Sequence, residues 1–146
     1  MNPTTVPLFN STITKTNDWL REIQQELDWD DSEKACKALR IVLHTLRDRL
    51  PLKEVTDLAA QLPMLVRGMY FEGWNPHHKP SKLKHADEFV EEVNSHFPEF
   101  DYTESEYIDP QEITRAIFAT LSNHVSAGEI EDVIGCLPKG LRELWV

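Results

Sequence analysis

Glycine and long apolar runs are both scarce in this sequence. Glycine occurs only 5 times in 146 residues, and the glycine-rich loops that bind phosphate in nucleotide-binding proteins are absent. No apolar run approaches the roughly 18 residues that a membrane-spanning helix needs. The first residues also lack the basic and apolar segments of a secretory signal. The sequence therefore disfavours a nucleotide-binding or membrane protein, and we expect a cytoplasmic one.

Basic residues are outnumbered by acidic ones. The chain has 15 Lys and Arg against 25 Asp and Glu, which gives a net charge of -10. A negative surface repels phosphate, so we expect neither nucleic acid nor an anionic membrane as a partner. Hydrophobic residues make up 40% of the chain, which is enough to build a core.

Cysteine is limited to Cys36 and Cys136, and neither belongs to a CxxC or Cys/His cluster. Both fall in helical patterns between apolar neighbours, where a single Cys usually packs as a small hydrophobic residue. This usage is typical of a reduced, cytosolic protein.

Signatures of catalysis are missing as well. The sequence contains no GxSxG, HExxH, GxGxxG or P-loop motif, and these are the patterns that place nucleophiles, metal ligands or phosphates. We therefore assign no catalytic, cofactor-binding or metal-binding residue, and we expect the protein not to be an enzyme.

Apolar residues recur with the 3.6-residue period of amphipathic helices from Thr16 onward. Residues 1–15 are polar and contain two prolines, and we expect them to form a flexible arm. Prolines at positions 51, 63, 110 and 138 separate the helical segments. We expect Leu62 and Leu137, which precede two of these prolines, to be buried, and Pro63 and Pro138 to take the first position of the next helix. The pattern predicts an all-α fold.

Two stretches of the chain resemble each other. DLAAQLPMLVRGMY, residues 57–70, aligns without a gap with DVIGCLPKGLRELW, residues 132–145, at a shift of seventy-five positions. Identities and apolar positions agree over some thirty residues, so we infer an internal duplication. The sequence predicts two tandem pseudo-repeats of about four helices each, 16–74 and 85–146. A hinge at 75–84 joins them, and they pack as one helical domain with Trp74 between them.

The duplication includes charged residues. The repeated pairs are Arg40 with Arg115, Glu54 with Glu129, Asp57 with Asp132, and Arg67 with Arg142. The two acids of each half lie three positions apart, on one helical face. They form either a charged binding site or structural ion pairs with the arginines, and we favour ion pairs because both halves carry the set. In SAGE, residues 126–129, Glu129 also fits the third position of a capping box begun by Ser126.

An acidic segment, residues 101–112, partly matches a calcium-binding loop. Its oxygen-bearing residues are Asp101, Thr103, Ser105, Asp109 and Glu112. The sixth position, which should be glycine for the sharp turn, is Glu106. A helix start explains the end of the segment better, with Asp109 as N-cap and Pro110 at the first helical position.

Three histidines lie in or beside the hinge, namely His77, His78 and His85. Adjacent histidines in an extended loop point apart, so a transition metal would need a further ligand from elsewhere in the fold. We favour a solvated hinge.

Three segments carry a resemblance to a known family: RLPLKEVTDLAAQLP, RGMYFEGWNP and GEIEDVIGCLPKGLRELW. Together they resemble a bacterial family of unknown function, the domain of unknown function numbered 2267, from about Thr16 to Val146. The resemblance implies an all-helical fold of two halves, and it supplies no activity. FDYTESEYIDPQE is richer in acids than that family usually is at this place.

These observations favour a non-catalytic module for protein interaction or regulation, with another protein as partner and no cofactor. We expect a monomer. The alternative is a ligand- or metal-responsive sensor that uses the acidic loop 101–112 or the His-containing hinge 74–85.

Overall fold

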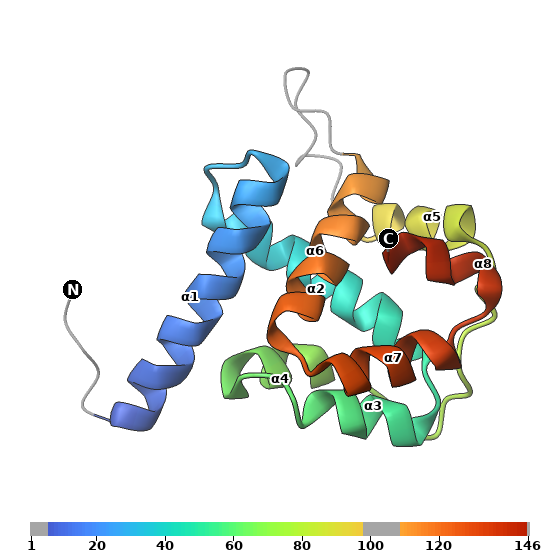
Figure 1. Ribbon diagram of the computed structural model, residues 1–146, viewed down its shortest axis with the longest axis horizontal. Coiled ribbons are helices and arrows are strands. Elements are labelled where there is room, and N and C mark those ends of the chain that lie inside the picture. The colour runs from blue at the N-terminus through green and yellow to red at the C-terminus, as the bar shows by residue number, and fades with distance from the viewer. Residues whose placement is uncertain (1–5, 98–108, 146) are drawn as a thin grey trace.

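The computed structural model describes residues 6–97 and 109–145, which form eight α-helices and no strand (Figure 1). The helices are α1 (Pro7–Leu27), α2 (Ser32–Arg49), α3 (Leu52–Ala59), α4 (Met64–Phe71), α5 (Ala86–Ser95), α6 (Pro110–His124), α7 (Ala127–Cys136) and α8 (Lys139–Arg142). A short 3-10 helix, η2 (Glu143–Trp145), follows α8. The predicted all-α class is confirmed.

Helix α1 begins at Pro7, well before Thr16, where the apolar periodicity starts. The prediction of a flexible arm was therefore wrong for residues 7–15. Pro7 suits a first helical position because its nitrogen has no hydrogen to leave unpaired. A tertiary contact also holds this part of the helix: buried Thr12 accepts a hydrogen bond through Oγ1 from the backbone N–H of Leu65, at 2.9 Å.

The starts of α2 and α6 follow the predicted capping chemistry. Asp31 accepts hydrogen bonds from the backbone N–H groups of Glu33 and Lys34. Asp109 does the same for Gln111 and Glu112, and Pro110 follows at the first helical position. Each aspartate thus accepts hydrogen bonds from backbone N–H groups that have no partner within the helix at its start.

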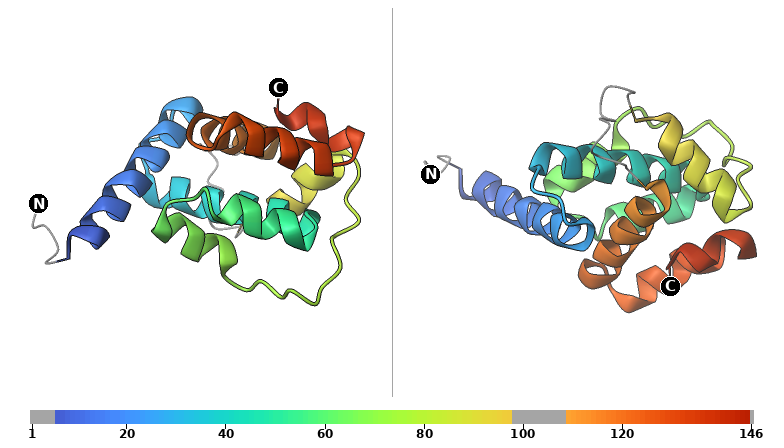
Figure 2. Two further views of the ribbon diagram at one scale, coloured as in Figure 1. Left: turned by 60° about the horizontal axis from the view of Figure 1, so that its bottom comes forward. Right: turned by 90° about the horizontal axis from the view of Figure 1, so that it is seen from above.

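The helices of the two predicted halves are packed together rather than side by side as separate bundles. Helix α1 packs on α2 and α6, α5 packs on α6 and α2, and α3 lies along α7 (Figures 1 and 2). The buried residues form one core cluster to which both halves contribute. It includes Trp19 and Leu43 from the first half and Phe89 and Phe118 from the second.

Leu62 and Leu137, which precede the repeated prolines, are both buried, as predicted. Pro63 and Pro138 occupy the N-cap positions of α4 and α8 rather than the first helical positions that we expected. Their extended backbone turns the chain into a new helix while the leucine before each proline remains in the core.

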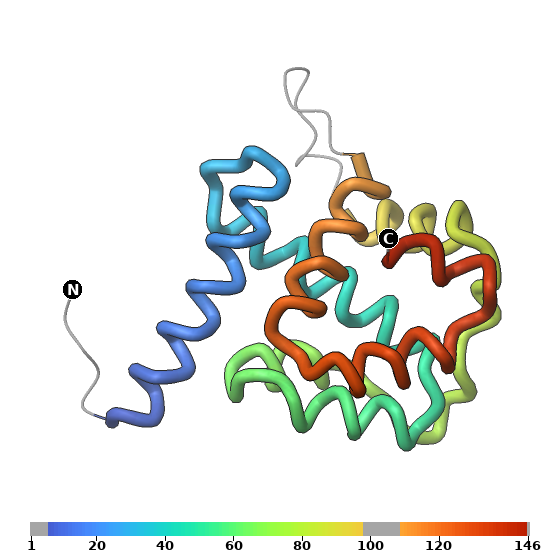
Figure 3. Tube along the Cα trace, in the orientation of Figure 1, coloured from blue at the N-terminus to red at the C-terminus, as the bar shows by residue number. Residues whose placement is uncertain are grey.

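The long connection from α4 to α5 runs along the edge of the molecule, as the tube in Figure 3 shows. It is tied to α2: Ser81 donates its backbone N–H to the carbonyl of Asp48 at 2.7 Å, and Arg49 Nε donates to the carbonyl of Leu83 at 2.6 Å. Trp74 packs on Phe71, with ring centroids 5.2 Å apart. The predicted place for Trp74 was the junction, but the helix pairs named above make the main contacts between the halves.

None of the helices within residues 6–97 and 109–145 combines the length and the apolar character needed to cross a bilayer.

Candidate functional site

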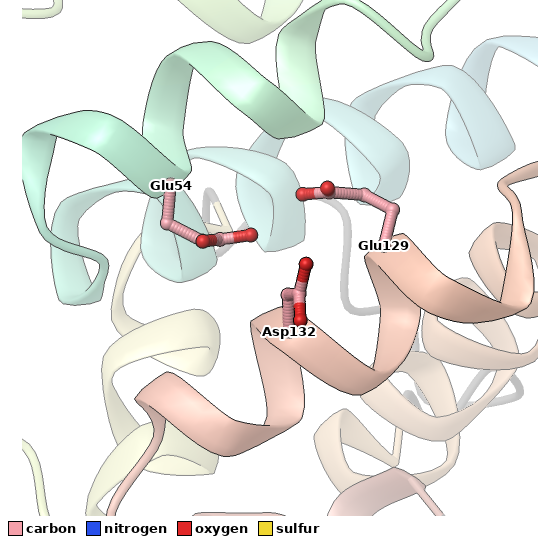
Figure 4. Close-up of side chains that lie close together, drawn as sticks. All are labelled: Glu54, Glu129 and Asp132. Atoms are coloured by element: carbon pink, nitrogen blue, oxygen red, sulfur yellow. The ribbon is translucent and has the colours of Figure 1, made fainter.

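Helices α3 and α7 bring three carboxylates together at their contact. Glu54 comes from α3, and Glu129 and Asp132 come from α7 (Figure 4). One carboxylate oxygen from each residue lies within 4.8 Å of the others. We call these three residues the carboxylate cluster.

The amphipathic pattern of the two helices positions the cluster. In α3, Val55 and Leu58 are buried in the core, and Glu54 beside them retains only 6% of its exposed surface. In α7, Ile130 and Val133 are buried, which turns the adjacent Glu129 and Asp132 toward α3 (Figure 4). Glu129 is half-buried and Asp132 is exposed, so the cluster extends from the interior to the surface.

Two oxygens of the cluster are buried without a hydrogen-bond partner among the described residues. They are Oε1 of Glu54 and Oε1 of Glu129. The other oxygen of Glu54 accepts a weak hydrogen bond from the thiol of Cys136, with a sulfur–oxygen distance of 3.8 Å. Buried carboxylate oxygens are costly to leave unpaired, so this arrangement requires a proton or a cation to stabilise it.

The carboxylates alter one another's protonation. Burial raises the pKa of Glu129 to about 7, and the neighbouring carboxylates of Glu54, Asp57 and Asp132 add to this shift. Near neutral pH, a proton on Glu129 can therefore be shared with Glu54. The neighbouring Lys53 pairs with Asp57, with a nitrogen–oxygen distance of 2.7 Å.

The predicted ion pairs between repeated arginines and repeated acids were wrong. Arg40 pairs with Glu72, with Nε 3.0 Å from Oε1. Arg67 and Arg142 donate to main-chain carbonyl groups near the ends of the preceding helices. Arg115 donates to the carbonyl of Glu143 at 3.1 Å. Helix ends leave several carbonyl groups unpaired, and the long guanidinium side chains reach them.

The predicted capping box at the start of α7 is only half formed. Ser126 accepts a hydrogen bond through Oγ from the backbone N–H of Glu129, at 3.3 Å. The backbone N–H of Ser126 donates to Oε1 of Gln61 at 3.2 Å. Because Gln61 takes the place of the returning glutamate, the Glu129 carboxylate can face Glu54.

The acidic segment 101–112 was one of the two metal sites considered from the sequence. Its residues Asp101, Thr103 and Ser105 lie outside the described residues. Asp109 caps α6, and Glu112 occupies the third position of that helix.

His77, His78 and His85 are all exposed. They do not join a close group of three potential metal ligands within the described parts of the chain, where such a group is formed by the carboxylate cluster. The sequence signal for that cluster was the pairing of Glu54 with Glu129, which we interpreted as structural.

The cysteines differ in environment. Cys36 packs against the core, and its sulfur lies 3.8 Å from that of Met69. Cys136 is exposed at the end of α7, so its prediction as a packed hydrophobic residue was wrong. Burial and the charge of Glu54 raise the pKa of the Cys136 thiol, which keeps it protonated and poorly nucleophilic.

A cavity of about 620 Å³ opens between α2, the α4–α5 connection and α5. The ion pair of Arg40 and Glu72 lines it, as do His44 and Ser81. Burial lowers the pKa of His44, whose Nε2 lies 2.6 Å from the carbonyl oxygen of Met69. Three separate segments form this cavity, so periodicity along the sequence could not reveal it.

Large apolar side chains are exposed where α1 and α4 begin. Leu8 and Phe9 keep 59% and 47% of their surface exposed, and Met64 and Leu65 keep 40% and 43%. The hydrogen bond between Leu65 and Thr12 joins the start of α4 to the second turn of α1. We call these four residues the apolar patch.

The protein is thus a small all-α protein with a carboxylate cluster between two short helices. The chain belongs to the family described as "Uncharacterized conserved protein (DUF2267)", which matches residues 16–144. This confirms the resemblance seen in the sequence. A comparison with curated proteins finds no match.

Proposed function

We propose that this protein is a non-catalytic interaction module of the cytoplasm, which binds another protein through the apolar patch on α1 and α4. The observation that carries the proposal is the exposure of Leu8 and Phe9 on α1 and of Met64 and Leu65 on α4, two helices that the hydrogen bond between Thr12 and Leu65 joins. Grouped apolar side chains on a protein surface are typical of interaction sites. Aromatic and Met side chains are also enriched where proteins meet.

The geometry of the patch supports this function. The N-terminal part of α1 extends away from the other helices, so a partner has access to it (Figure 1). Hydrogen bonding between Thr12 and Leu65 fixes the register of the two helix starts before a partner arrives. A preformed surface reduces the entropy that binding must overcome.

The chemistry of the thiols agrees with a non-catalytic role. Burial raises the pKa of Cys36 and of Cys136, which disfavours the thiolate form that nucleophilic catalysis needs. Glu129 has a raised pKa, but its partners are other carboxylates. The cavities of about 620, 390 and 350 Å³ are lined by residues outside the carboxylate cluster.

We also infer that the two halves arose by duplication and are related by an approximate twofold rotation. The helix contacts support this: α1 packs on α2 and α6, and its counterpart α5 packs on α6 and α2. Helices α2 and α6 pack on each other, as do α3 and α7, so counterparts meet in pairs. Exchanging the halves leaves this set of contacts unchanged. Glu54 and Glu129, which match at the seventy-five-residue shift, then face each other across the rotation axis.

A sensor that uses the acidic loop 101–112 or the hinge 74–85 has less support. The side chain of Asp109 is already engaged in capping α6. The backbone N–H of His85 donates to Oε1 of Glu88 at 3.0 Å, as part of the start of α5. These roles explain the residues without a ligand.

The test is an affinity capture from the native host with the full chain as bait. A double variant, Leu8→Ser with Phe9→Ser, should lose the captured protein while far-UV circular dichroism stays unchanged. Leu52→Ser is the matched control, because Leu52 is equally exposed but begins α3. Equal capture by the double variant and the wild type would refute the proposal. Concentration-dependent dimerisation abolished by the double variant would make a second copy of this chain the partner.

A further inference from the structure

The carboxylate cluster can be assigned a ligand, and this goes beyond the proposed interaction through the apolar patch. We propose that Glu54, Glu129 and Asp132 bind one hard divalent cation, of about the size of Ca²⁺, between α3 and α7. The evidence comes from the geometry of the three oxygens, the burial of Glu54 and the open side at Asp132.

The donor set and its spacing suit a hard cation. Three carboxylates offer oxygen ligands, which Ca²⁺, Mg²⁺ and Mn²⁺ prefer over softer metals. Their oxygens lie within 4.8 Å of one another. Ca²⁺ binds oxygen at about 2.3–2.6 Å, so two oxygens bound to one Ca²⁺ lie at most about 4.6–5.2 Å apart, and the cluster falls within this limit. Ca²⁺ also accepts irregular coordination, whereas Mg²⁺ demands near-octahedral geometry with bonds of about 2.0–2.1 Å.

The burial of Glu54 points to a ligand independently of the number of acids nearby. Its carboxylate is more than nine-tenths buried, and Oε1 has no hydrogen-bond partner among the described residues. Figure 4 shows this carboxylate directed toward Glu129 and Asp132. A cation at the centre would bind both Oε1 of Glu54 and Oε1 of Glu129. It would offset the cost of burying these two oxygens without a hydrogen-bond partner.

The cluster is open to solvent on one side. Asp132 is exposed, so water can complete the coordination and the ion can enter from this side. With three protein ligands and an open side, we expect a Kd of about 10⁻⁴–10⁻³ M.

Binding would have a structural consequence. The ion joins Glu54 of the first half to Glu129 and Asp132 of the second, so it strengthens the contact between α3 and α7. Cation binding is therefore expected to raise the thermal stability of the whole chain, since both helices pack on one core.

The experiment is isothermal titration calorimetry of CaCl₂ into the full chain at about pH 7.5. We expect one saturable site. Asp132→Asn and Glu129→Gln should each weaken binding by about tenfold or more. Asp132 is exposed, so its substitution leaves the fold intact even if a change at Glu129 or Glu54 does not.

Two matched controls locate the site. Glu131→Gln removes the same charge from an exposed position of α7, and Glu112→Gln removes the last oxygen ligand of the acidic segment 101–112. Both should bind Ca²⁺ as the wild type does. Weakening by Glu131→Gln equal to that by Glu129→Gln would indicate diffuse attraction to an acidic surface and overturn the proposal. Loss of binding in Glu112→Gln would assign the ion to the acidic segment and overturn it too.

Titrations with MgCl₂ and MnCl₂ test the size of the ion. We expect Mg²⁺ to bind more weakly than Ca²⁺, because it demands near-octahedral geometry and gives up its water ligands reluctantly. Tighter binding of Mg²⁺ would refute the inferred size. An absence of saturable heat with all three cations up to about 10 mM would refute the site itself.

Discussion

Arg67 and Arg142 make the same kind of contact in the two halves of the chain. Arg67 donates from Nε to the carbonyl of Ala59 at 2.9 Å and from a terminal nitrogen to that of Leu62 at 3.0 Å. Arg142 donates from Nε to the carbonyl of Leu137 at 3.0 Å and from a terminal nitrogen to that of Gly135 at 3.4 Å. Each arginine thus joins its own short helix to the end of the helix before it.

Replacing either arginine by Ala should therefore destabilise the protein by about 1–3 kcal/mol, because partly buried carbonyls lose a charged donor. Urea denaturation followed by circular dichroism measures the loss. Arg21→Ala is the control, since Arg21 forms an exposed ion pair with Asp18 and should change stability by less than about 1 kcal/mol. Equal effects of the three substitutions would contradict this role of Arg67 and Arg142.

Glu129→Gln should change how stability depends on pH. The folded protein raises the pKa of Glu129 from 4.5 to about 7. The folded state therefore holds this proton more tightly than the unfolded state, and stability falls as pH rises from about 4.5 to 7. Glutamine stays neutral and can donate to Glu54, so at about pH 8 the variant should be more stable than the wild type, by about 1 kcal/mol.

The measurement is the difference in free energy of unfolding between wild type and variant from about pH 4 to 8. The charged and titratable groups that interact with Glu129 are Glu54 and Asp57 on α3, Asp132 and Cys136 on α7, and Tyr70 on α4. Burial lowers the pKa of His44, so this residue makes the protein less stable as the pH falls below about 6.5. Wild type and Glu129→Gln share this effect, so it cancels in the difference between their free energies of unfolding. A difference that stays constant with pH would show that Glu129 titrates normally.

Gly140→Ala should destabilise the protein by about 1–3 kcal/mol. A Cβ atom at this position of α8 would meet the backbone carbonyl of Lys84 and the ring of His85. Backbone cannot move aside as a flexible side chain can, so α8 would be pushed away from the start of α5. Gly135→Ala is the control, because a Cβ there meets nothing within 4 Å, and a change from Gly to Ala inside a helix should stabilise by up to about 1 kcal/mol. Thermal melts compare the two variants.

Leu62→Ala and Leu137→Ala should each cost about 2–5 kcal/mol through the cavity left in the core. Both side chains are buried just before the turns into α4 and α8. Chemical denaturation midpoints measure the loss, and the exposed Leu52→Ala should shift the midpoint little. Unchanged midpoints for Leu62 and Leu137 would show that these residues do not anchor their turns.

Residues 1–74 and 79–146, expressed separately, should be unstable or aggregate. Each fragment loses the contacts of α1 with α6, α2 with α5 and α3 with α7, and exposes the core faces that these contacts bury. Units of this size are marginal even when intact. Two-dimensional NMR checks this, and a dispersed native-like spectrum from either fragment alone would contradict it. Recovery of a native-like spectrum on mixing would support the interleaved packing.

The sequence by itself determined the helices, because local chemistry sets them. The apolar period near 3.6 residues marked the segments, and Asp109 with Pro110 marked the start of α6. The same period identified Leu62 and Leu137 as core residues. Local rules failed at α1: residues 7–15 carry a weak apolar pattern, and their helix is held in part by the contact of Thr12 with Leu65 of α4.

Only the tertiary structure decided where the charged side chains go. The arginines pair with carbonyls and with Glu72, and Gln61 displaces Glu129 from the capping box. These contacts depend on which helices pack against each other. The spacing of residues along the sequence shows which side chains share a helical face, but not which helix that face contacts. The packing of α3 on α7 then brings Glu54 against Glu129. Burial at this contact raises the pKa of Glu129, which is therefore a property of the fold rather than of either helix.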